Sequence, residues 1–268
     1  MKRFSLLVYL LAIYLVSFSQ KFAIQPGILH YQVEPGKAQS QVVRITNVSD
    51  EKISFQAYLG DWLRDSTGGH EYYRPDTLRQ SCASWVKLNK NFIEIGPKQT
   101  EELMVVLRGP FAPAAYDKMR WAMLFLQSVQ EKDSAAARSK VVKTEIKEVM
   151  RVGIHIYQTP PTVTKAAAQA ISFKKIESEN NKFAFSVANS GQVMLQCKAS
   201  LTLTAIESGK EFKLDKVEFP MFPDGKRSVK FEVPSTVPKG KYSALAVLDI
   251  GEDETLQAIE KTIDIKGQ

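Results

Sequence analysis

The chain of 268 residues is longer than one typical domain, so two domains are the first expectation. Hydrophobic residues make up 44% of it and charged residues 24%, which suits a globular core and excludes a wholly disordered or fibrous protein. The 36 lysines and arginines outnumber the 29 acidic residues, for a formal net charge of +7. The sequence has no Lys/Arg-rich stripe with interleaved aromatic residues, so nucleic acid is not an expected partner.

The first residues have the pattern of a secretory signal peptide. Lys2 and Arg3 precede an apolar run from Phe4 to Phe18, and Ser17 and Ser19 provide small residues before Gln20. The alternative is an N-terminal membrane anchor, but a spanning helix needs about 20 apolar residues and this run is shorter. We therefore expect residues 1–19 to be cleaved and the mature chain to be exported.

Short β-branched segments bounded by turn residues follow in the first half of the chain. The predicted strands are Gln41–Thr46, Ile53–Tyr58, Phe92–Ile95, Leu103–Leu107 and Trp121–Val129. Such spacing is typical of an antiparallel sandwich or barrel and not of alternating βαβ units.

A proline pair at Pro160 and Pro161 interrupts this pattern and is the best candidate for a domain boundary. Strand-like segments then resume at Lys182–Ala188, Leu195–Leu203, Val229–Val233, Tyr242–Asp249 and Ala258–Ile265. The predicted fold class is all-β, with two immunoglobulin-like β-sandwich domains in tandem at residues 20–159 and 162–268. Tyr116 and Tyr242 each stand before a late strand, as in the tyrosine corner of such sandwiches.

The sequence contains no constellation typical of catalysis or metal binding. His30, His70 and His155 are widely spaced, and there is no nucleophile elbow, P-loop or dinucleotide fingerprint. We therefore expect no enzyme activity, no metal, no cofactor and no small-molecule substrate. Cys82 and Cys197 are expected to be buried free thiols, with a disulfide between them as the alternative.

The segment Val141–Tyr157 is the candidate partner-binding site. Read as a strand, it places Val142, Thr144, Ile146, Met150, Val152, Ile154 and Ile156 on one face. At ~3.3 Å per residue the strand would be longer than one small sandwich covers, so part of the apolar row would remain at an edge for a partner. Burial of the row in the chain's own core, and a helix near the start of the segment, are the alternatives.

The order of segments in the first domain resembles that of PapD-like periplasmic chaperones, of which the chain would be a divergent member. The resemblance is carried by Ile24-Gln25-Pro26, the Val42–Asn47 strand, Phe92–Pro97, the segment from Tyr116 to Leu126, and Arg151–Pro160. It implies a two-sandwich carrier without a cofactor that lends a strand to an incomplete client, a form of β-augmentation.

The family anchors a client carboxylate with an arginine of the first strand and a lysine of the seventh. Here these positions fall near Ile28 or Leu29 and near Gly153 or Ile154, none of them basic, so the anchor does not transfer. Arg151 lies close by and could replace it, or could be an ordinary surface arginine. The predicted partner-binding residues are Val142, Thr144, Ile146, Met150 and Arg151.

Three functions remain open from the sequence. The leading hypothesis is a periplasmic chaperone or assembly factor that binds an envelope or secreted protein client through a sheet edge. The alternative is a non-catalytic accessory subunit, permanently associated with an outer-membrane or cell-surface complex. A carbohydrate-binding sandwich that stacks sugars on Trp62, Trp85 or Trp121 is a third hypothesis, although Trp121 lies in an apolar run that fits a core.

Overall fold

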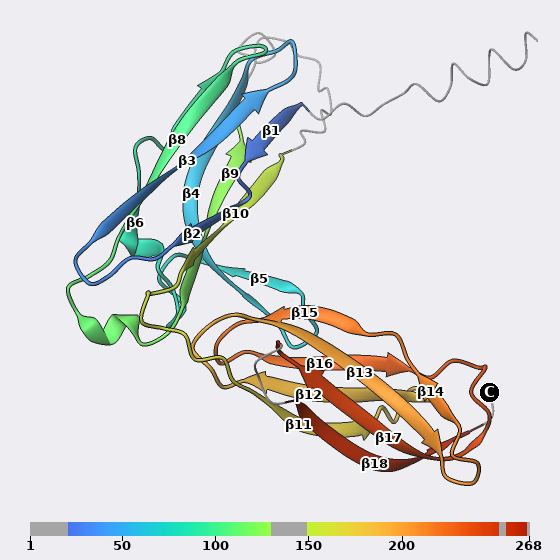
Figure 1. The fold of residues 1–268 in the computed structure, drawn as a ribbon. Helices are drawn as coiled ribbons and strands as arrows, with labels where there is room; N and C mark the ends of the chain where they lie inside the picture. The colour runs from blue at the N-terminus through green and yellow to red at the C-terminus, as the bar shows by residue number, and fades with distance from the viewer. Residues whose placement is uncertain (1–20, 130–148, 252–255, 267–268) are drawn as a thin grey trace, which may run out of the picture.

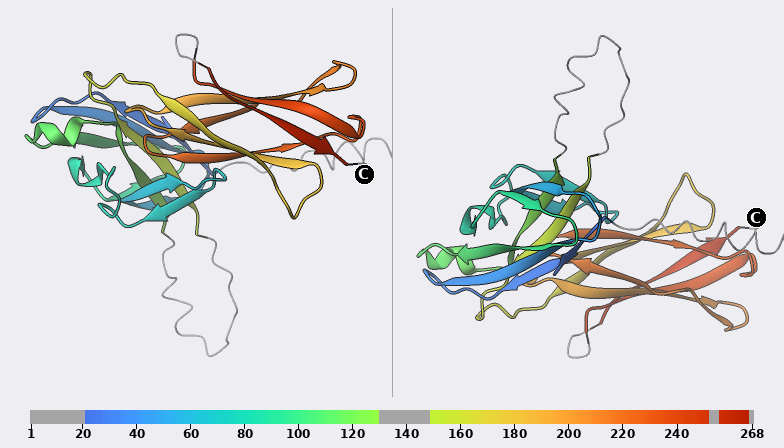
Figure 2. Two further views of the ribbon diagram at one scale, coloured as in Figure 1. Left: turned by 90° about the horizontal axis from the view of Figure 1, so that it is seen from below. Right: turned by 90° about the horizontal axis from the view of Figure 1, so that it is seen from above.

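The computed structural model describes residues 21–129, 149–251 and 256–266. They form two β-sandwiches set at an angle to each other, with β1 to β10 in the first and β11 to β18 in the second (Figure 1). Figure 2 shows the same arrangement from below and above, where the second sandwich partly overlaps the first and extends beyond it. The predicted all-β, two-sandwich fold is confirmed.

The first sandwich consists of a four-stranded sheet and a six-stranded sheet. The four-stranded sheet has the order β1 (Phe22–Gln25), β3 (Ala38–Asn47), β8 (Thr100–Arg108) and β6 (Val86–Leu88). The other runs β2 (Ile28–Tyr31), β10 (Arg151–Gln158), β9 (Arg120–Ser128), β4 (Ile53–Arg64) and β5 (His70–Tyr73), with β7 (Phe92–Ile95) also paired to β4. Short 3₁₀ helices lie at Ala83–Trp85 and Pro113–Tyr116.

The first strand is divided between these sheets. β1 pairs antiparallel with β3, whereas β2, only two residues further on, pairs parallel with β10 in the opposite sheet. Both sheets bury alternate side chains in a shared core that includes Ile45, Leu103, Leu124 and Ile156.

The second sandwich packs a three-stranded sheet on a five-stranded one. The smaller sheet has the order β11 (Ala168–Lys175), β12 (Lys182–Asn189) and β16 (Lys226–Glu232). The larger runs β14 (Glu211–Lys213), β13 (Leu195–Ala205), β17 (Gly240–Asp249) and β18 (Gln257–Ile265), with β15 (Val217–Met221) also paired to β13.

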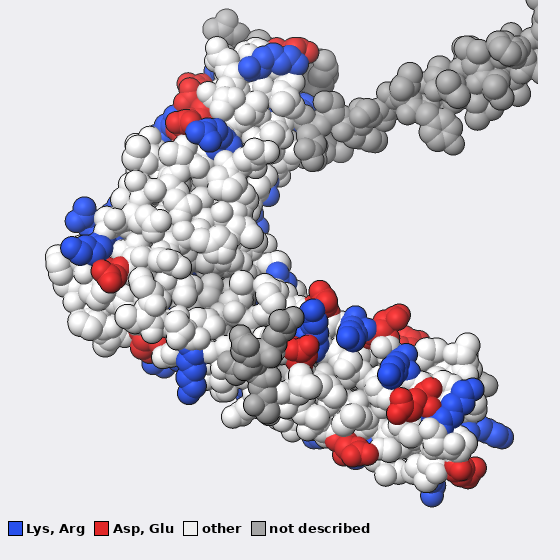
Figure 3. All heavy atoms as spheres, in the orientation of Figure 1, with Lys and Arg blue, Asp and Glu red and all other residues white. Residues whose placement is uncertain are grey.

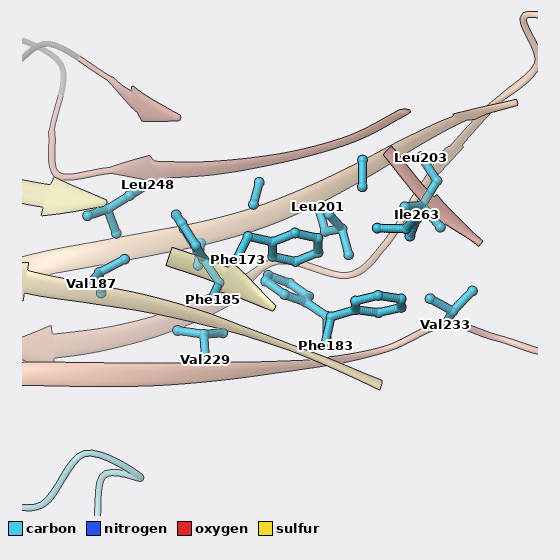
Figure 4. Close-up of a cluster of buried hydrophobic side chains, with 14 of the residues drawn as sticks. Phe173, Phe183, Phe185, Val187, Leu201, Leu203, Val229, Val233, Leu248 and Ile263 are labelled. Atoms are coloured by element: carbon cyan, nitrogen blue, oxygen red, sulfur yellow. The ribbon is translucent and has the colours of Figure 1, made fainter. Parts of the chain in front are cut away.

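Phenylalanines from the smaller sheet fill the core of the second sandwich (Figure 4). The rings of Phe173 and Phe183 stack with their centroids 5.4 Å apart, and Phe185 is fully buried beside them. On β13 the alternating residues Leu195, Cys197, Ala199, Leu201 and Leu203 are all buried, as the alternation predicts.

Each predicted strand overlaps a strand of the structure, but β4 continues to Arg64, well beyond the predicted end at Tyr58, and several strands are missing from the prediction. Phe92–Ile95 is reproduced without change, and Trp121–Val129 is displaced by one residue. β1, β2, β5, β6, β11, β14 and β15 were not predicted. Residues 141–148 of the candidate segment lie outside the described residues, as do residues 1–19, and β10 begins only at Arg151.

The boundary at Pro160 and Pro161 falls in the connection between β10 and β11, and the limits 20–159 and 162–268 remain our proposal for the two domains.

In the part of the chain that the structure describes, no helix is long and apolar enough to span a membrane. In the view of Figure 3 basic and acidic side chains are interspersed along the second sandwich, whereas the middle of the first sandwich is largely uncharged.

Both cysteines are buried free thiols, as predicted. Burial raises the pKa of Cys82 far above its ordinary value, and burial with the nearby Asp249 carboxylate raises that of Cys197 to about 12. Both thiols are therefore protonated and unreactive at neutral pH.

Each sandwich contains a tyrosine corner. The Tyr116 hydroxyl donates a hydrogen bond to the carbonyl oxygen of Pro110 at 3.0 Å. The Tyr242 hydroxyl donates to that of Pro238 at 2.8 Å. Both bonds run back to a residue a few positions earlier in the chain, which is the geometry expected of this motif.

We expect Tyr242→Phe to lower the free energy of unfolding by about 1 kcal/mol, because one hydrogen bond is lost and the Pro238 carbonyl loses its donor. Tyr73→Phe is the matched control, because the Tyr73 hydroxyl is bonded to Glu71 at an exposed site and its removal should cost less than about 0.5 kcal/mol. Urea unfolding of both variants measures the difference, and equal losses would contradict a structural role for the corner.

Candidate partner-binding edge and aromatic junction

The first half of β10 is an open sheet edge (Figure 1). β9 pairs with all of β10, but β2 pairs only with its last four residues, from His155 to Gln158. On the side away from β9, no described strand pairs with Arg151–Ile154.

Backbone groups at this edge point outward. The His155 N–H donates to the Gly27 carbonyl oxygen at 3.1 Å, on the side of β2. Because backbone direction alternates along a strand, the N–H and C=O groups of Arg151 and Gly153 point to the same side, beyond the end of β2. No described strand pairs with these groups, and a strand from another chain could do so.

The two faces of β10 are buried in different surroundings. Ile154 and Ile156 have no exposed surface and lie in the core of the first sandwich. His155 and Tyr157 alternate with them and face the junction with the second sandwich. In this part of the strand, the predicted apolar row therefore belongs to the chain's own core, which was one of the alternatives from the sequence.

The structure describes two of the five predicted partner-binding residues. Met150 and Arg151 are exposed where β10 begins, and the Arg151 guanidinium lies 5.4 Å from the Tyr72 ring centroid and 5.0 Å from that of Phe125. Val142, Thr144 and Ile146 lie outside the described residues. Arg151 is thus a surface arginine that rests on aromatic rings at the open edge.

A cluster of large side chains joins the two sandwiches. This aromatic junction consists of Trp62, Met119, Trp121, Met123, Phe125, Tyr157 and Phe222. Phe222, from the second sandwich, places its ring 5.1 Å from that of Trp62 and 4.9 Å from that of Trp121. The Trp121 indole N–H donates to the Trp62 carbonyl oxygen at 2.7 Å, and the Trp62 indole N–H donates to the Ala122 carbonyl oxygen at 3.2 Å, so each indole is held by its own hydrogen bond.

Hydrogen bonds connect the sandwiches on either side of this cluster. The Met119 N–H donates to the Gln192 carbonyl oxygen at 2.8 Å, and the Ser228 N–H donates to that of Ser66 at 2.8 Å. The Lys118 ammonium is 2.7 Å from the Asp224 carboxylate. The loop between β4 and β5 is thereby fixed on β16.

All three histidines of the chain lie on this same sheet face. The His155 ring is 4.7 Å from Trp62 and 5.9 Å from His70, and the His30 ring is 5.5 Å from Tyr157. The buried Nε2 atom of His155 has no hydrogen-bond partner among the residues that the structure describes. Burial, helped by the charges of His70 and Arg64, lowers the His155 pKa to about 4, so its ring is neutral at neutral pH. No group of three or more His, Cys, Asp and Glu side chains among the described residues is placed to hold a metal ion.

Sequence reasoning missed the junction, although one signal for it was present. Residues 121–126 are apolar without alternation, and all six are buried. In a strand with one solvent-exposed face, apolar and polar residues would alternate, so this run indicates that both faces of β9 are covered. No sequence signal indicated that Phe222, which lies about a hundred residues further on, supplies the cover.

No protein-family model matches the sequence, and no curated protein matches it. Solved structures do match. A chain of a chaperone–tip adhesin complex described as vital for activation of CFA/I fimbriae biogenesis has a TM-score of 0.52 at 12% identity, covering 91% of this chain and 98% of the other. The class 5 fimbriae chaperone CfaA has a TM-score of 0.48 at 13% identity, covering 90% and 98%. The Pseudomonas aeruginosa CupB2 chaperone has a TM-score of 0.42 at 12% identity, covering 91% and 99%.

At such low identity the first of these matches shows the fold alone. The chain has the two-sandwich fold that its resemblance to PapD-like chaperones implies, and the match extends over both sandwiches.

We expect the free energy of unfolding to fall as the pH is lowered from about 6.5 to about 4, in part because of His155. The unfolded chain takes up a proton at the ordinary histidine pKa of 6.5, whereas the folded chain does so only near 4. Throughout this window the unfolded state binds more protons, so stability is lost with acid.

His155→Gln removes this contribution. At pH 7.5 the free energy of unfolding of the variant differs from that of the wild type only by the cost of the substitution. This difference should become smaller as the pH is lowered to 5, because only the wild type loses the His155 contribution.

Thermal unfolding at a series of pH values measures the stability of both proteins. If the two plots of stability against pH stay parallel, His155 titrates normally in the folded protein.

Proposed function

We propose that the chain is a non-catalytic periplasmic chaperone or assembly factor that binds an envelope or secreted protein client through a sheet edge. The observation that carries this proposal is the edge of β10 at Arg151 and Gly153, whose backbone groups pair with no described strand on the side away from β9. A client strand placed there would extend the six-stranded sheet by β-augmentation. The solved structure with a TM-score of 0.52 belongs to a chaperone–tip adhesin complex, which supports this class of function.

The proposed contact residues are Val142, Thr144, Ile146, Met150 and Arg151. The last two lie at the start of the open edge, and the first three directly precede it in the sequence. The alternating side chains of Val142, Thr144, Ile146 and Met150 would contact the client while the backbone of β10 pairs with a client strand.

Arg151→Pro tests the backbone part of this proposal. The Arg151 N–H points away from β9, so proline removes a donor from the open edge without breaking the β9 pairing. We expect client binding to weaken about three- to tenfold, since one hydrogen bond is worth roughly 0.5–1.5 kcal/mol, while the thermal midpoint of the free protein stays nearly unchanged. Arg151→Ala is the control that loses the side chain and keeps the N–H.

The assay uses the tagged full chain in its native host. Proteins that co-purify with it from the envelope fraction are identified by mass spectrometry and then quantified for each variant. Ile146→Lys should also reduce capture at unchanged stability, whereas Ile154→Lys, in the core, should destabilise the free protein. If both Arg151→Pro and Ile146→Lys capture as much client as the wild type, the edge is not the client-binding site. A client that never exchanges in a pulse-chase experiment would indicate the permanent accessory subunit instead.

Export is the remaining part of the proposal. We expect the mature protein to begin at or near Gln20 and to fractionate with the periplasm, because the first nineteen residues have the pattern of a cleaved signal. N-terminal sequencing of the protein from envelope fractions measures this. A product that keeps Met1 and stays in the membrane would show that the segment is an anchor.

A further inference from the structure

A cavity of about 320 Å³ lies between the two sandwiches, next to the aromatic junction. Residues 63–66 and Trp121 line it from the first sandwich, and residues 220–227 from the second. At about 30 Å³ per water molecule, it has room for a small polyatomic ion together with several waters.

Two arginines, one from each sandwich, line this cavity. Arg64 is the last residue of β4, and Arg227 is the second residue of β16. The Ser228 N–H that bonds to the Ser66 carbonyl oxygen at 2.8 Å holds the two chain segments together. A Cβ atom at Gly68 would collide with the Arg227 guanidinium, so this group packs directly on the loop that follows Arg64.

Both guanidinium groups have unused donors. The buried side-chain nitrogens without a hydrogen-bond partner among the described residues are Arg64 Nε, Arg227 Nε and His155 Nε2. Arg64 Nη1 donates to the Gly68 carbonyl oxygen at 3.0 Å, but neither arginine forms an ion pair within the described part of the chain. A buried donor without a partner costs roughly 1–3 kcal/mol, and more when it is charged.

The acidic groups beside the cavity are already engaged. Asp65 Oδ1 accepts hydrogen bonds from the backbone N–H groups of Thr67, Gly68 and Gly69. Asp224 is held by Lys118 at 2.7 Å. The Asp65 charge acts on Arg227, but burial and the charge of Arg64 outweigh it and lower the Arg227 pKa. Arg64, Lys226 and Arg227 on the wall outnumber Asp65 and Asp224, and Asp224 is paired with Lys118, so the cavity carries a net positive charge.

We propose that this cavity binds a tetrahedral oxyanion of the phosphate or sulfate class between Arg64 and Arg227, and that the bound ion holds the two sandwiches together. Both guanidinium groups contact Gly68, Arg64 through a hydrogen bond and Arg227 by packing, and a tetrahedral ion has four oxygens that can accept from the two groups at once. A carboxylate has two oxygens in one plane and would pair well with only one of the two guanidinium groups.

The test is isothermal titration of the full mature chain with inorganic phosphate and with sulfate, at fixed ionic strength in chloride. We expect saturable binding of both ions by the wild type, and Kd values at least about tenfold higher for Arg64→Gln and for Arg227→Gln. Arg108→Gln, an exposed arginine on β8, is the matched control and should bind like the wild type.

Thermal unfolding provides a readout that a purely structural role would not give. In chloride alone, Arg227→Gln should melt at or above the wild-type temperature, because the substitution removes a repulsion between like charges. In phosphate the wild type should melt higher than the variant, since an ion that binds only the folded state stabilises it.

Three results would overturn the proposal. One is an equal rise in melting temperature for the wild type and both variants, which would be a general salt effect on exposed surface. Another is the absence of any heat of binding in the titrations. The third is acetate binding as tightly as phosphate, which would make this a carboxylate site. Methyl phosphate distinguishes the natural source, because its binding would show that the site also accepts a phosphate group carried on a larger molecule.

Discussion

The alternation of side chains along β10 is the constraint on which both candidate surfaces depend. Ile154 and Ile156 fix one face of the strand in the core of the first sandwich, so His155 and Tyr157 must face the junction with the second. Backbone hydrogen bonding adds a second condition. β2 is only four residues long and covers the last half of β10, which leaves the first half open. A one-residue change of register would exchange the two faces and disrupt both surfaces together.

Packing, and not ion pairing, dominates the connection between the sandwiches. The Lys118–Asp224 pair has side chains that are 35% and 53% exposed, and exposed pairs of this kind contribute at most about 1 kcal/mol. Phe222 is only 6% exposed, and burial of such a side chain contributes about 1.5–3 kcal/mol in addition to its contacts with the rings of Trp62 and Trp121. The angle between the sandwiches is therefore set by the shape of the aromatic junction, and the hydrogen bonds on either side of it fix which segments of the two sandwiches lie against each other.

Local patterns in the sequence predicted the longer strands, the tyrosine corners and the buried thiols, because these depend on alternation and turn residues within a few positions. The junction depends on residues far apart in the chain, such as Trp62 and Phe222, and no short pattern relates them. The histidines illustrate the same limit: their spacing predicted nothing, yet His30, His70 and His155 share one sheet face. Short strands such as β5, with four exposed residues, carry no burial pattern to detect.

The short length of the open edge limits what the backbone alone can contribute to client binding. Arg151 and Gly153 offer one N–H and one C=O group each, and about four hydrogen bonds at roughly 0.5–1.5 kcal/mol give some 2–6 kcal/mol. A dissociation constant of 1 μM needs about 8 kcal/mol after the cost of association, so the edge cannot hold a client by hydrogen bonds alone. Side chains must supply the difference. The small number of open backbone groups also protects the free protein from aggregation, because so short an edge with the charged Arg151 at its start is a poor template for pairing with other chains.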